Sequence, residues 1–273
     1  MLTFPDPRVT KDLMVADMIA HAEADRLMAG TYGADDDDGF RGCAVGCSIH
    51  TINRLTGTDY GYGDHAALAR AIGVPEALLR LQDSVFEGLP PAQRKKWPES
   101  FYRAIPEGAD LRPAFNRILV RMLREVTLPT VTVEVEKWGI GPAIEGVCRA
   151  IETGVGLKDA RAAADAAYAR AYAAAYAAAD AGYAAEAARA AYVAYVAYGA
   201  ARAGYADGGA EVAYGAARAG YADGGAEVAA IAGAEGAEVA AISGAAVGCG
   251  WGGATAYEKI GVIICEEMER CKA

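Results

Sequence analysis

The amino-acid sequence predicts an all-α protein, in which a compact helical part is followed by an Ala/Gly-rich helical tract of short repeats. Three observations support this fold class. Apolar residues recur at helical spacing through most of residues 1–156, alanine dominates residues 157–253, and residues 254–273 return to helical spacing. Alanine has the highest helix propensity, which favours helix in the tract as well. We therefore expect three parts with these bounds, and we expect the last helix to pack back on the compact part.

Seven helices are predicted in the compact part, from periodic apolar residues and from local start and stop signals. Asp64 is the expected N-cap of the third helix, and the Pro90-Pro91 pair stops the fourth. The predicted helices cover residues 11–28, 42–55, 66–73, 76–86, 99–105, 111–123 and 140–153. Residues 127–137 instead alternate with the two-residue period of a strand. This strand has no partner in the sequence, so we interpret it as a linker or an edge segment.

The alanine-rich tract contains identical repeats. Residues 196–211 and 212–227 have the same sixteen-residue sequence, and two related eleven-residue units follow. At about 100° per residue, sixteen residues end about 160° out of phase, so one straight helix would point equivalent side chains in opposite directions. We therefore expect one long helix over 160–197, followed by short helices separated by Asp-Gly-Gly turns. Identical repeats favour a scaffold or interaction role for the tract.

Composition narrows the classes of partner. The formal net charge is −10, whereas proteins that bind a nucleic-acid backbone usually have a basic face, so we expect no nucleic-acid partner. The N-terminus has no basic start followed by an apolar run, and six cysteines are scattered along the chain, which favours a reduced, cytosolic protein. The uncharged run 239–257 consists mainly of glycine and alanine, which give little transfer free energy into lipid. We expect no membrane span.

Three segments carry a resemblance to a known family. These are GCAVGCSIHT (42–51), DHAALARAIGVPEALLRLQDSVFEGLP (64–90) and FYRAIPEGADL (101–111). They resemble a family of uncharacterised phage and prophage proteins, which carry GCAVGC-x-x-H, FEGLP and AIPxGADL motifs before an alanine-rich tract, and some of which are labelled immunity proteins. The resemblance covers nearly all of the chain. It implies an all-α protein of the host cytosol, expressed during phage infection; the high glycine content and the identical repeats of the tract depart from the family pattern.

The segment 42–55 holds the densest group of reactive side chains. In a helix, Cys43, Cys47 and His50 would share one face, and His65 follows close by. One hypothesis is a zinc site made by these four residues, although their spacing is not a common finger spacing. Another is a Cys47–His50 nucleophile pair, for which no third orienting residue is evident. The favoured interpretation is two small buried cysteines with His50 at a pocket rim, since cysteine is among the most buried residue types.

Four adjacent carboxylates lie in the loop before this segment. Asp35–Asp38 could hold a divalent cation, but calcium loops place their ligands at alternate positions with a turn glycine and a final glutamate. A solvated acidic loop is the favoured interpretation. The sequence therefore assigns no metal, no cofactor and no catalytic residue.

A binding function makes different use of the segment 42–55. The glycines at 39, 42 and 46 would let backbone amides approach a ligand, and a helix N-terminus there would favour an anion. Basic groups and tyrosines could complete such a site by charge and by stacking on a base. The predicted ligand-binding residues are Arg41, Cys47, His50, His65, Tyr168, Arg170 and Tyr172.

The leading functional hypothesis combines this site with the family resemblance. It describes a phage-encoded anti-defence protein that binds and sequesters a small, anionic, nucleotide-derived immune signal. Two alternatives stay open: an inhibitor or immunity protein that binds a host protein, and an enzyme that degrades a nucleotide messenger through a Cys/His site. Because alanine-rich surfaces bury little area within one chain, we also expect a homodimer.

Overall fold

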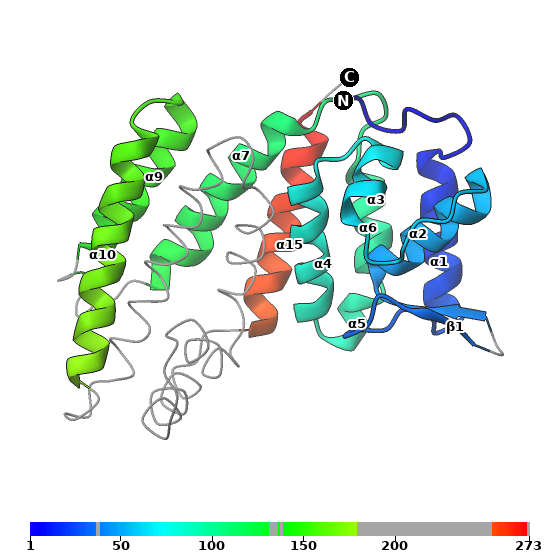
Figure 1. Cartoon of the computed structure of the whole chain (residues 1–273), viewed down its shortest axis with the longest axis horizontal. Helices are drawn as coiled ribbons and strands as arrows, with labels where there is room; N and C mark the ends of the chain where they lie inside the picture. Colours follow the sequence, from blue (N-terminus) through cyan, green and yellow to red (C-terminus); the bar gives the residue numbers. More distant parts are fainter. Residues whose placement is uncertain (37–38, 131–135, 137–138, 179–252, 272–273) are drawn as a thin grey trace. The chain divides into compact units, whose positions relative to one another are not determined.

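The structure is a computed structural model that describes residues 1–36, 39–130, 136, 139–178 and 253–271. These residues are mostly helical, and the all-α prediction is confirmed (Figure 1). The chain forms two compact units. Unit 1 comprises Met1–Ile118 together with Tyr257–Ala273, and unit 2 comprises Leu119–Ala256. The division at residues 118 and 119 falls within a helix, whereas the sequence suggested a boundary near residue 156.

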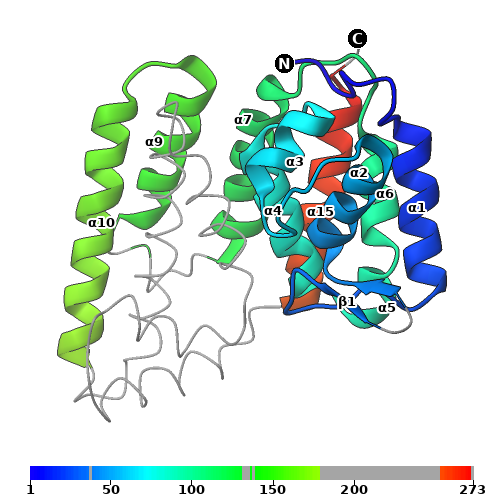
Figure 2. The same cartoon turned by 45° about the vertical axis from the view of Figure 1, so that its right-hand side comes forward.

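Unit 1 consists of short helices around an apolar core. Its elements in chain order are α1 (Lys11–Glu23), β1 (Ala34–Asp36), β2 (Gly39–Arg41), α2 (Ala44–Thr56), α3 (His65–Ile72), α4 (Glu76–Gly88), α5 (Pro91–Arg94), α6 (Trp97–Ala104), most of α7 (Arg112–Arg121) and most of α15 (Gly253–Glu269). The strands β1 and β2 form a short antiparallel hairpin. α2 contacts α1, α3 and α4, which places it at the centre of the unit (Figure 2). The predicted N-cap is confirmed, because the Asp64 carboxylate accepts a hydrogen bond from the Ala67 amide at 2.8 Å.

α1 is shorter than the sequence predicts. The helix ends at Glu23, and Asp25 adopts a left-handed backbone conformation with φ 56°, which a right-handed helix cannot contain. Leu27 then forms a β-bridge with Gly42, and the Met28 amide donates to the Gly42 carbonyl at 2.8 Å. Leu27 is buried in this bridge. Its apolar side chain therefore belongs to the hairpin side of the core and not to the helix.

The last helix, α15, packs on helices that are far away in the sequence. Figures 1 and 2 both show it beside α4. Gly88 of α4 gives room to the Tyr257 ring, because a Cβ at that glycine would lie 2.2 Å from a ring carbon. Glu267 is fully buried and accepts a hydrogen bond from Arg117 of α7 at 2.7 Å. The apolar side that the sequence predicts for residues 254–271 is buried as expected: Ile260, Ile263, Ile264 and Met268.

Unit 2 continues the helix that begins in α7. A π-helical turn, η1 (Met122–Thr127), is followed by a 3₁₀ turn, η2 (Leu128–Thr130), and then by α9 (Ile140–Thr153) and α10 (Leu157–Ala178). The bounds of α9 are those predicted from the sequence. The predicted strand over 127–137 is wrong where the structure describes it, because residues 127–130 and 136 are helical. The backbone of residues 127–130 continues the helical turns of η1 and η2 there, in spite of the alternating side-chain pattern; residues 131–135 and 137 lie outside the described residues.

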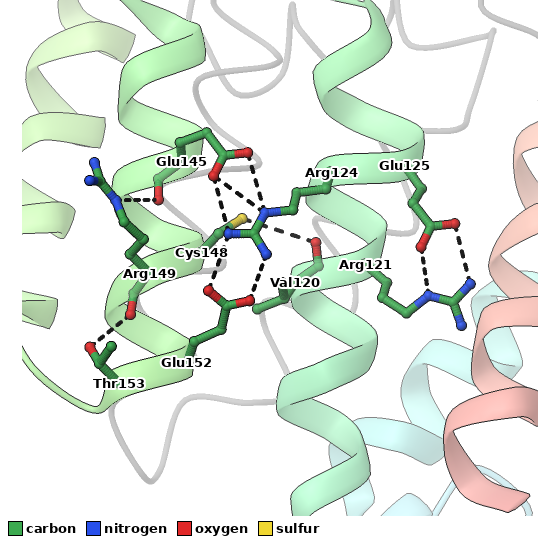
Figure 3. A network of polar contacts seen from close by, with 9 residues as sticks. All are labelled: Val120, Arg121, Arg124, Glu125, Glu145, Cys148, Arg149, Glu152 and Thr153. Carbon is green, nitrogen blue, oxygen red and sulfur yellow. Dashed lines mark hydrogen bonds and ion pairs between the residues drawn. The ribbon is translucent and has the colours of Figure 1, made fainter. Parts of the chain in front are cut away.

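An arginine joins η1 to α9 in unit 2. The Arg124 guanidinium donates to Glu145 at 3.1 Å and to Glu152 at 2.6 Å, while the Cys148 thiol on the same face of α9 lies 4.0 Å from the Val120 carbonyl (Figure 3). The hydrogen bonds that Arg124 donates to Glu152 and Glu145 raise the pKa of Arg124. The three charged side chains are about one-third exposed or more, so this network orients α9 more than it stabilises the unit.

The repeats of the alanine-rich tract lie within residues 179–252, outside the described residues. The beginning of the tract forms α10, a continuous helix of 22 residues. In the part of the chain that the structure describes, no helix is long and apolar enough to cross a membrane.

Candidate functional site

The N-terminus of α2 is built around two buried cysteines. Cys43 is the N-cap, and its sulfur accepts a hydrogen bond from the Gly46 amide at 3.5 Å. Cys47 is fully buried and its thiol points to the Gly42 carbonyl. Burial raises the pKa of the Cys47 thiol to about 12 and raises that of Cys43 still further. Both groups are therefore protonated thiols at neutral pH, which is the opposite of what a nucleophilic cysteine requires.

The glycines of this segment admit the protein's own backbone. A Cβ on Gly46 would lie 1.6 Å from the Tyr32 carbonyl oxygen, and one on Gly42 would lie 2.4 Å from the same atom. The Cys43 amide donates to the Thr31 carbonyl at 2.9 Å. This corrects the expectation that the glycines open the helix N-terminus to an anionic ligand, because residues 31 and 32 already occupy that space.

His50 of α2 belongs to a stack of rings. Its ring is parallel to Phe40 of β2, with centroids 4.6 Å apart, and the Tyr62 ring lies 4.4 Å from Phe40. The edge of the His21 ring meets His50 at 5.9 Å. Arg41 follows Phe40 on β2 and is half-buried. Two of the predicted ligand-binding residues, Arg41 and His50, thus lie near the same aromatic cluster.

His21 is paired with a half-buried aspartate, Asp17, that has several donors. Asp17 accepts hydrogen bonds from His21 at 3.4 Å, from Arg54 at 2.7 Å and from the Thr51 hydroxyl. Burial acts to raise the pKa of Asp17, but the hydrogen bonds of His21 and Thr51 and the charge of Arg54 outweigh it and lower the pKa to about 2. This group is a satisfied anion that ties α1 to α2.

His65 lies in a different cluster, which also contains Cys43. Its Nδ1 is 3.0 Å from the Gly63 carbonyl, and its Nε2 is 3.2 Å from an Asp83 oxygen of α4. One ligand atom each from Cys43, Asp83 and Glu87 lie within 4.8 Å of one another. The structure therefore brings Cys43 together with α4 carboxylates, whereas Cys47 points to the Gly42 carbonyl and His50 joins the ring stack. We call Cys43, His65, Asp83 and Glu87 the polar cluster.

The carboxylates of the polar cluster were missed by sequence reasoning. Asp83 and Glu87 are four residues apart on α4, a spacing that is also typical of a solvated helix face. No local signal relates them to Cys43, which is forty residues earlier. Only the packing of α2 and α3 against α4 brings the four side chains together.

The remaining predicted ligand-binding residues belong to unit 2. Tyr168, Arg170 and Tyr172 lie on α10, where Arg170 is exposed. The side chains of the two tyrosines lie outside the described residues. A site that combines them with Arg41, His50 and His65 stays a prediction.

Unit 1 also has a surface groove of about 520 Å³, which lies along α15 beside α5 and α6. Its apolar lining comes from Trp97, Tyr257, Val262 and Cys265, and its charged lining from Lys96, Glu258, Glu266 and Glu269. Val262 is 55% exposed. Residues 258, 262, 265 and 269 follow helical spacing, so this stripe was readable from the sequence, although the buried stripe of the same helix attracted the prediction.

No family model matches this sequence, and no match was found among curated proteins or solved structures. Function is therefore inferred from the residues themselves.

Proposed function

We propose that this protein works by binding a protein partner, and that the groove along α15 takes a basic, amphipathic helix of that partner. The observation that carries the proposal is the groove itself, with an apolar centre and a mostly acidic rim. This is the inhibitor or immunity-protein alternative of the sequence analysis.

The chemistry of the groove favours one kind of occupant. Of the apolar lining, Val262 is exposed while Trp97 and Tyr257 are largely buried, so the apolar face of a partner helix would rest mainly on Val262. Three glutamates and one lysine line the groove, so it attracts positive charge and repels a phosphate-bearing molecule. A helix with apolar residues on one side and lysine or arginine at its flanks matches both features.

The thiols support binding over catalysis. Burial raises the pKa of Cys43, Cys47, Cys148 and Cys265. A thiol becomes a nucleophile through a lowered pKa and an adjacent base. These four therefore lack the property that a degrading enzyme with a Cys/His site would need.

A second candidate is the sequestration of a nucleotide-derived signal, as the sequence analysis suggests. One observation favours it: the rings of His50, Phe40 and Tyr62 stack beside the hairpin that carries Arg41. Aromatic rings next to an arginine suit a base and its phosphates. The resemblance to phage proteins would make such a ligand an immune signal of the host.

The two candidates are separated by matched probes. We would measure the fluorescence anisotropy of a labelled Leu/Lys amphipathic peptide, and of its Leu/Glu twin, with the full chain. The groove proposal expects the Leu/Lys peptide to bind, with an affinity that falls as salt rises. Equal binding of both peptides, or of neither, would count against it.

Substitutions test whether the Leu/Lys peptide binds in the groove along α15. Val262→Asp should weaken binding of the Leu/Lys peptide by about tenfold or more, because it places a charge in the apolar centre of the groove. Val155→Asp, at a valine of unit 2 that is 74% exposed, is the matched control and should leave binding unchanged. Thermal shift with cyclic dinucleotides and ADP-ribose derivatives tests the second candidate, and a shift that Tyr62→Ala abolishes would favour it over the groove.

A further inference from the structure

The polar cluster brings four side chains with three kinds of metal-binding group close together in unit 1. Cys43 comes from the N-cap of α2, His65 from the first residue of α3, and Asp83 and Glu87 from successive turns of α4. The sulfur of Cys43 and one oxygen each of Asp83 and Glu87 lie within 4.8 Å of one another. His65 Nε2 lies 3.2 Å from Asp83 Oδ2. Three helices therefore hold sulfur, nitrogen and oxygen donors close together.

One carboxylate oxygen of the cluster has unsatisfied bonding capacity. Asp83 Oδ1 is buried and has no hydrogen-bond partner among the described residues. A buried carboxylate oxygen without a partner is unfavourable, because it has lost its water and gained nothing in return. Among the described residues, Asp83 forms an ion pair with His65 alone, and Glu87 accepts one hydrogen bond, from the Gly30 amide at 2.8 Å. The nearby Arg94 donates to the backbone carbonyls of Phe86 and Glu87 and not to these carboxylates.

The tautomer of His65 is set by its backbone contact. A carbonyl can only accept, so the Gly63 oxygen fixes the proton of the imidazole on Nδ1. In the neutral ring, Nε2 then presents a lone pair toward Asp83, which also carries only lone pairs. Such a contact is favourable only with a cation between the two atoms, either a proton or a metal ion. A histidine that donates one ring N–H to a carbonyl and offers the other nitrogen is the usual arrangement of a metal ligand.

The pKa shifts of Cys43 and Glu87 are those expected for acidic groups that lie close together without a cation between them. Burial raises the pKa of Cys43, and the charge of Asp83 raises it further. Burial also raises the pKa of Glu87, and Asp83 adds to this increase against the opposing effects of the Gly30 amide and of the Arg94 charge. The acidic groups thus disfavour one another's ionisation, and a divalent cation would remove that penalty for all of them.

We propose that the polar cluster is a binding site for a zinc-type divalent ion, with Cys43, Asp83, Glu87 and His65 as its ligands. Mixed sulfur, nitrogen and oxygen donors select zinc over magnesium or calcium, which prefer six or more oxygens. Metal–ligand distances of about 2.0 to 2.3 Å imply that the ligand atoms draw together by side-chain rotation when the ion enters. Binding releases the Cys43 thiol proton to solvent and keeps His65 neutral. This site is separate from the groove and does not depend on the proposed function.

The decisive experiment uses cobalt(II) as a spectroscopic probe. The full chain is treated with a chelator, desalted and titrated with CoCl₂, while absorbance is followed in the near-ultraviolet, where thiolate-to-cobalt charge transfer absorbs. We expect one equivalent of cobalt to bind with this band and one equivalent of ZnCl₂ to abolish it. Native mass spectrometry should show one zinc per chain. Absence of both the band and the bound metal would overturn the proposal.

Variants separate this site from the one that the sequence suggested. Cys43→Ala should lose the band, whereas Cys47→Ala, at the neighbouring buried cysteine of the same helix, should keep it. Glu87→Gln has nearly the same shape and should weaken zinc binding by at least about tenfold while the circular dichroism spectrum stays unchanged. A band that survives in Cys43→Ala, or zinc affinity that Glu87→Gln leaves intact, would refute this ligand set even if one of the cysteine variants were misfolded.

Discussion

Unit 1 contains two aspartate–histidine pairs in which the histidine is buried and the aspartate is half-buried, and they differ in what else surrounds the aspartate. In the first pair, Asp17 receives His21 and also the donors of Thr51 and Arg54. In the second pair, Asp83 receives His65 alone among the residues that the structure describes, and the acidic groups of Cys43 and Glu87 lie close to it. Three side-chain donors contact the first aspartate, while the second lies beside a thiol and a second carboxylate. The groups around each aspartate–histidine pair therefore determine whether the carboxylate is satisfied within the fold or keeps bonding capacity for a ligand.

α2 contacts α1, which carries the first pair, and also α3 and α4, which carry the second. The largest expected loss of stability comes from a substitution at Gly46 of α2, where the backbone of Tyr32 lies against this helix. Gly46→Ala would place a Cβ 1.6 Å from the Tyr32 carbonyl oxygen. Backbone has to move, so we expect a loss of about 3 kcal/mol in the free energy of unfolding, at the upper end of overpacking effects. Because the Tyr32 ring packs edge-on against His65 at 5.7 Å, the polar cluster should be disturbed more than the Asp17 group.

Urea denaturation measures this loss, and a second helical glycine provides the control. Gly146 of α9 has nothing within 4 Å of the position where a Cβ would be built. Gly146→Ala should therefore be neutral or stabilising by about 0.5 to 1 kcal/mol, through helix propensity alone. Equal effects of the two substitutions would show that Tyr32 does not cross α2 as described.

The next effect compares the two aspartates directly. Asp17→Asn replaces an anion with an amide whose NH₂ group faces the donors of His21 and Arg54, so we expect a loss of about 2 kcal/mol in the free energy of unfolding. Asp83→Asn in metal-free protein should lose less than about 1 kcal/mol, because removing its charge relieves Cys43 and Glu87. Denaturation in the presence of a chelator measures both. A larger loss of stability for Asp83→Asn than for Asp17→Asn would show that Asp83, and not Asp17, is the aspartate that stabilises the fold.

The stability of the protein should depend on pH in opposite ways through Asp17 and Glu87. The folded-state pKa of Asp17 is about 2, below the ordinary value of 3.8, so its stabilisation is present above the ordinary value and is lost as pH falls. The difference in stability between wild type and Asp17→Asn should therefore shrink between about pH 4 and about pH 2. Glu87 has a raised pKa and should behave in the opposite way, with wild type gaining on Glu87→Gln as pH falls. Urea titrations at several pH values would show parallel trends if the two environments were alike.

Local signals explain what the sequence could predict. The bounds of α9, the N-cap at Asp64 and the buried face of α15 follow from spacing and capping rules that act within a few residues. The early end of α1 could not be foreseen, because Leu27 is held by a bridge to Gly42 fifteen residues later.

The candidate sites depend on contacts over longer distances in the sequence. Cys43 and His65 were singled out as reactive residues, but their partners Asp83 and Glu87 resemble any exposed pair on a helix until α4 packs against α2 and α3. In the same way, glycines that suggested room for a ligand instead make room for the Tyr32 carbonyl. In each contact, the sequence motif therefore identified one of the two partners, and the second partner became evident only from the packing of the helices.

The smallest expected loss of stability comes from removing one of the hydrogen-bond donors of Asp17. Thr51→Val keeps the shape of the buried side chain but removes the hydroxyl that donates to Asp17, so we expect a loss of about 1 kcal/mol in the free energy of unfolding. The pKa of Asp17 should rise, since one of the hydrogen bonds that lower it is gone. NMR titration of the Asp17 carboxyl measures that rise, and Thr153→Val, at an exposed threonine of α9, should change stability by less than about 0.5 kcal/mol. An unchanged Asp17 pKa in Thr51→Val would mean that His21 and Arg54 are enough to hold this pKa low without the hydroxyl.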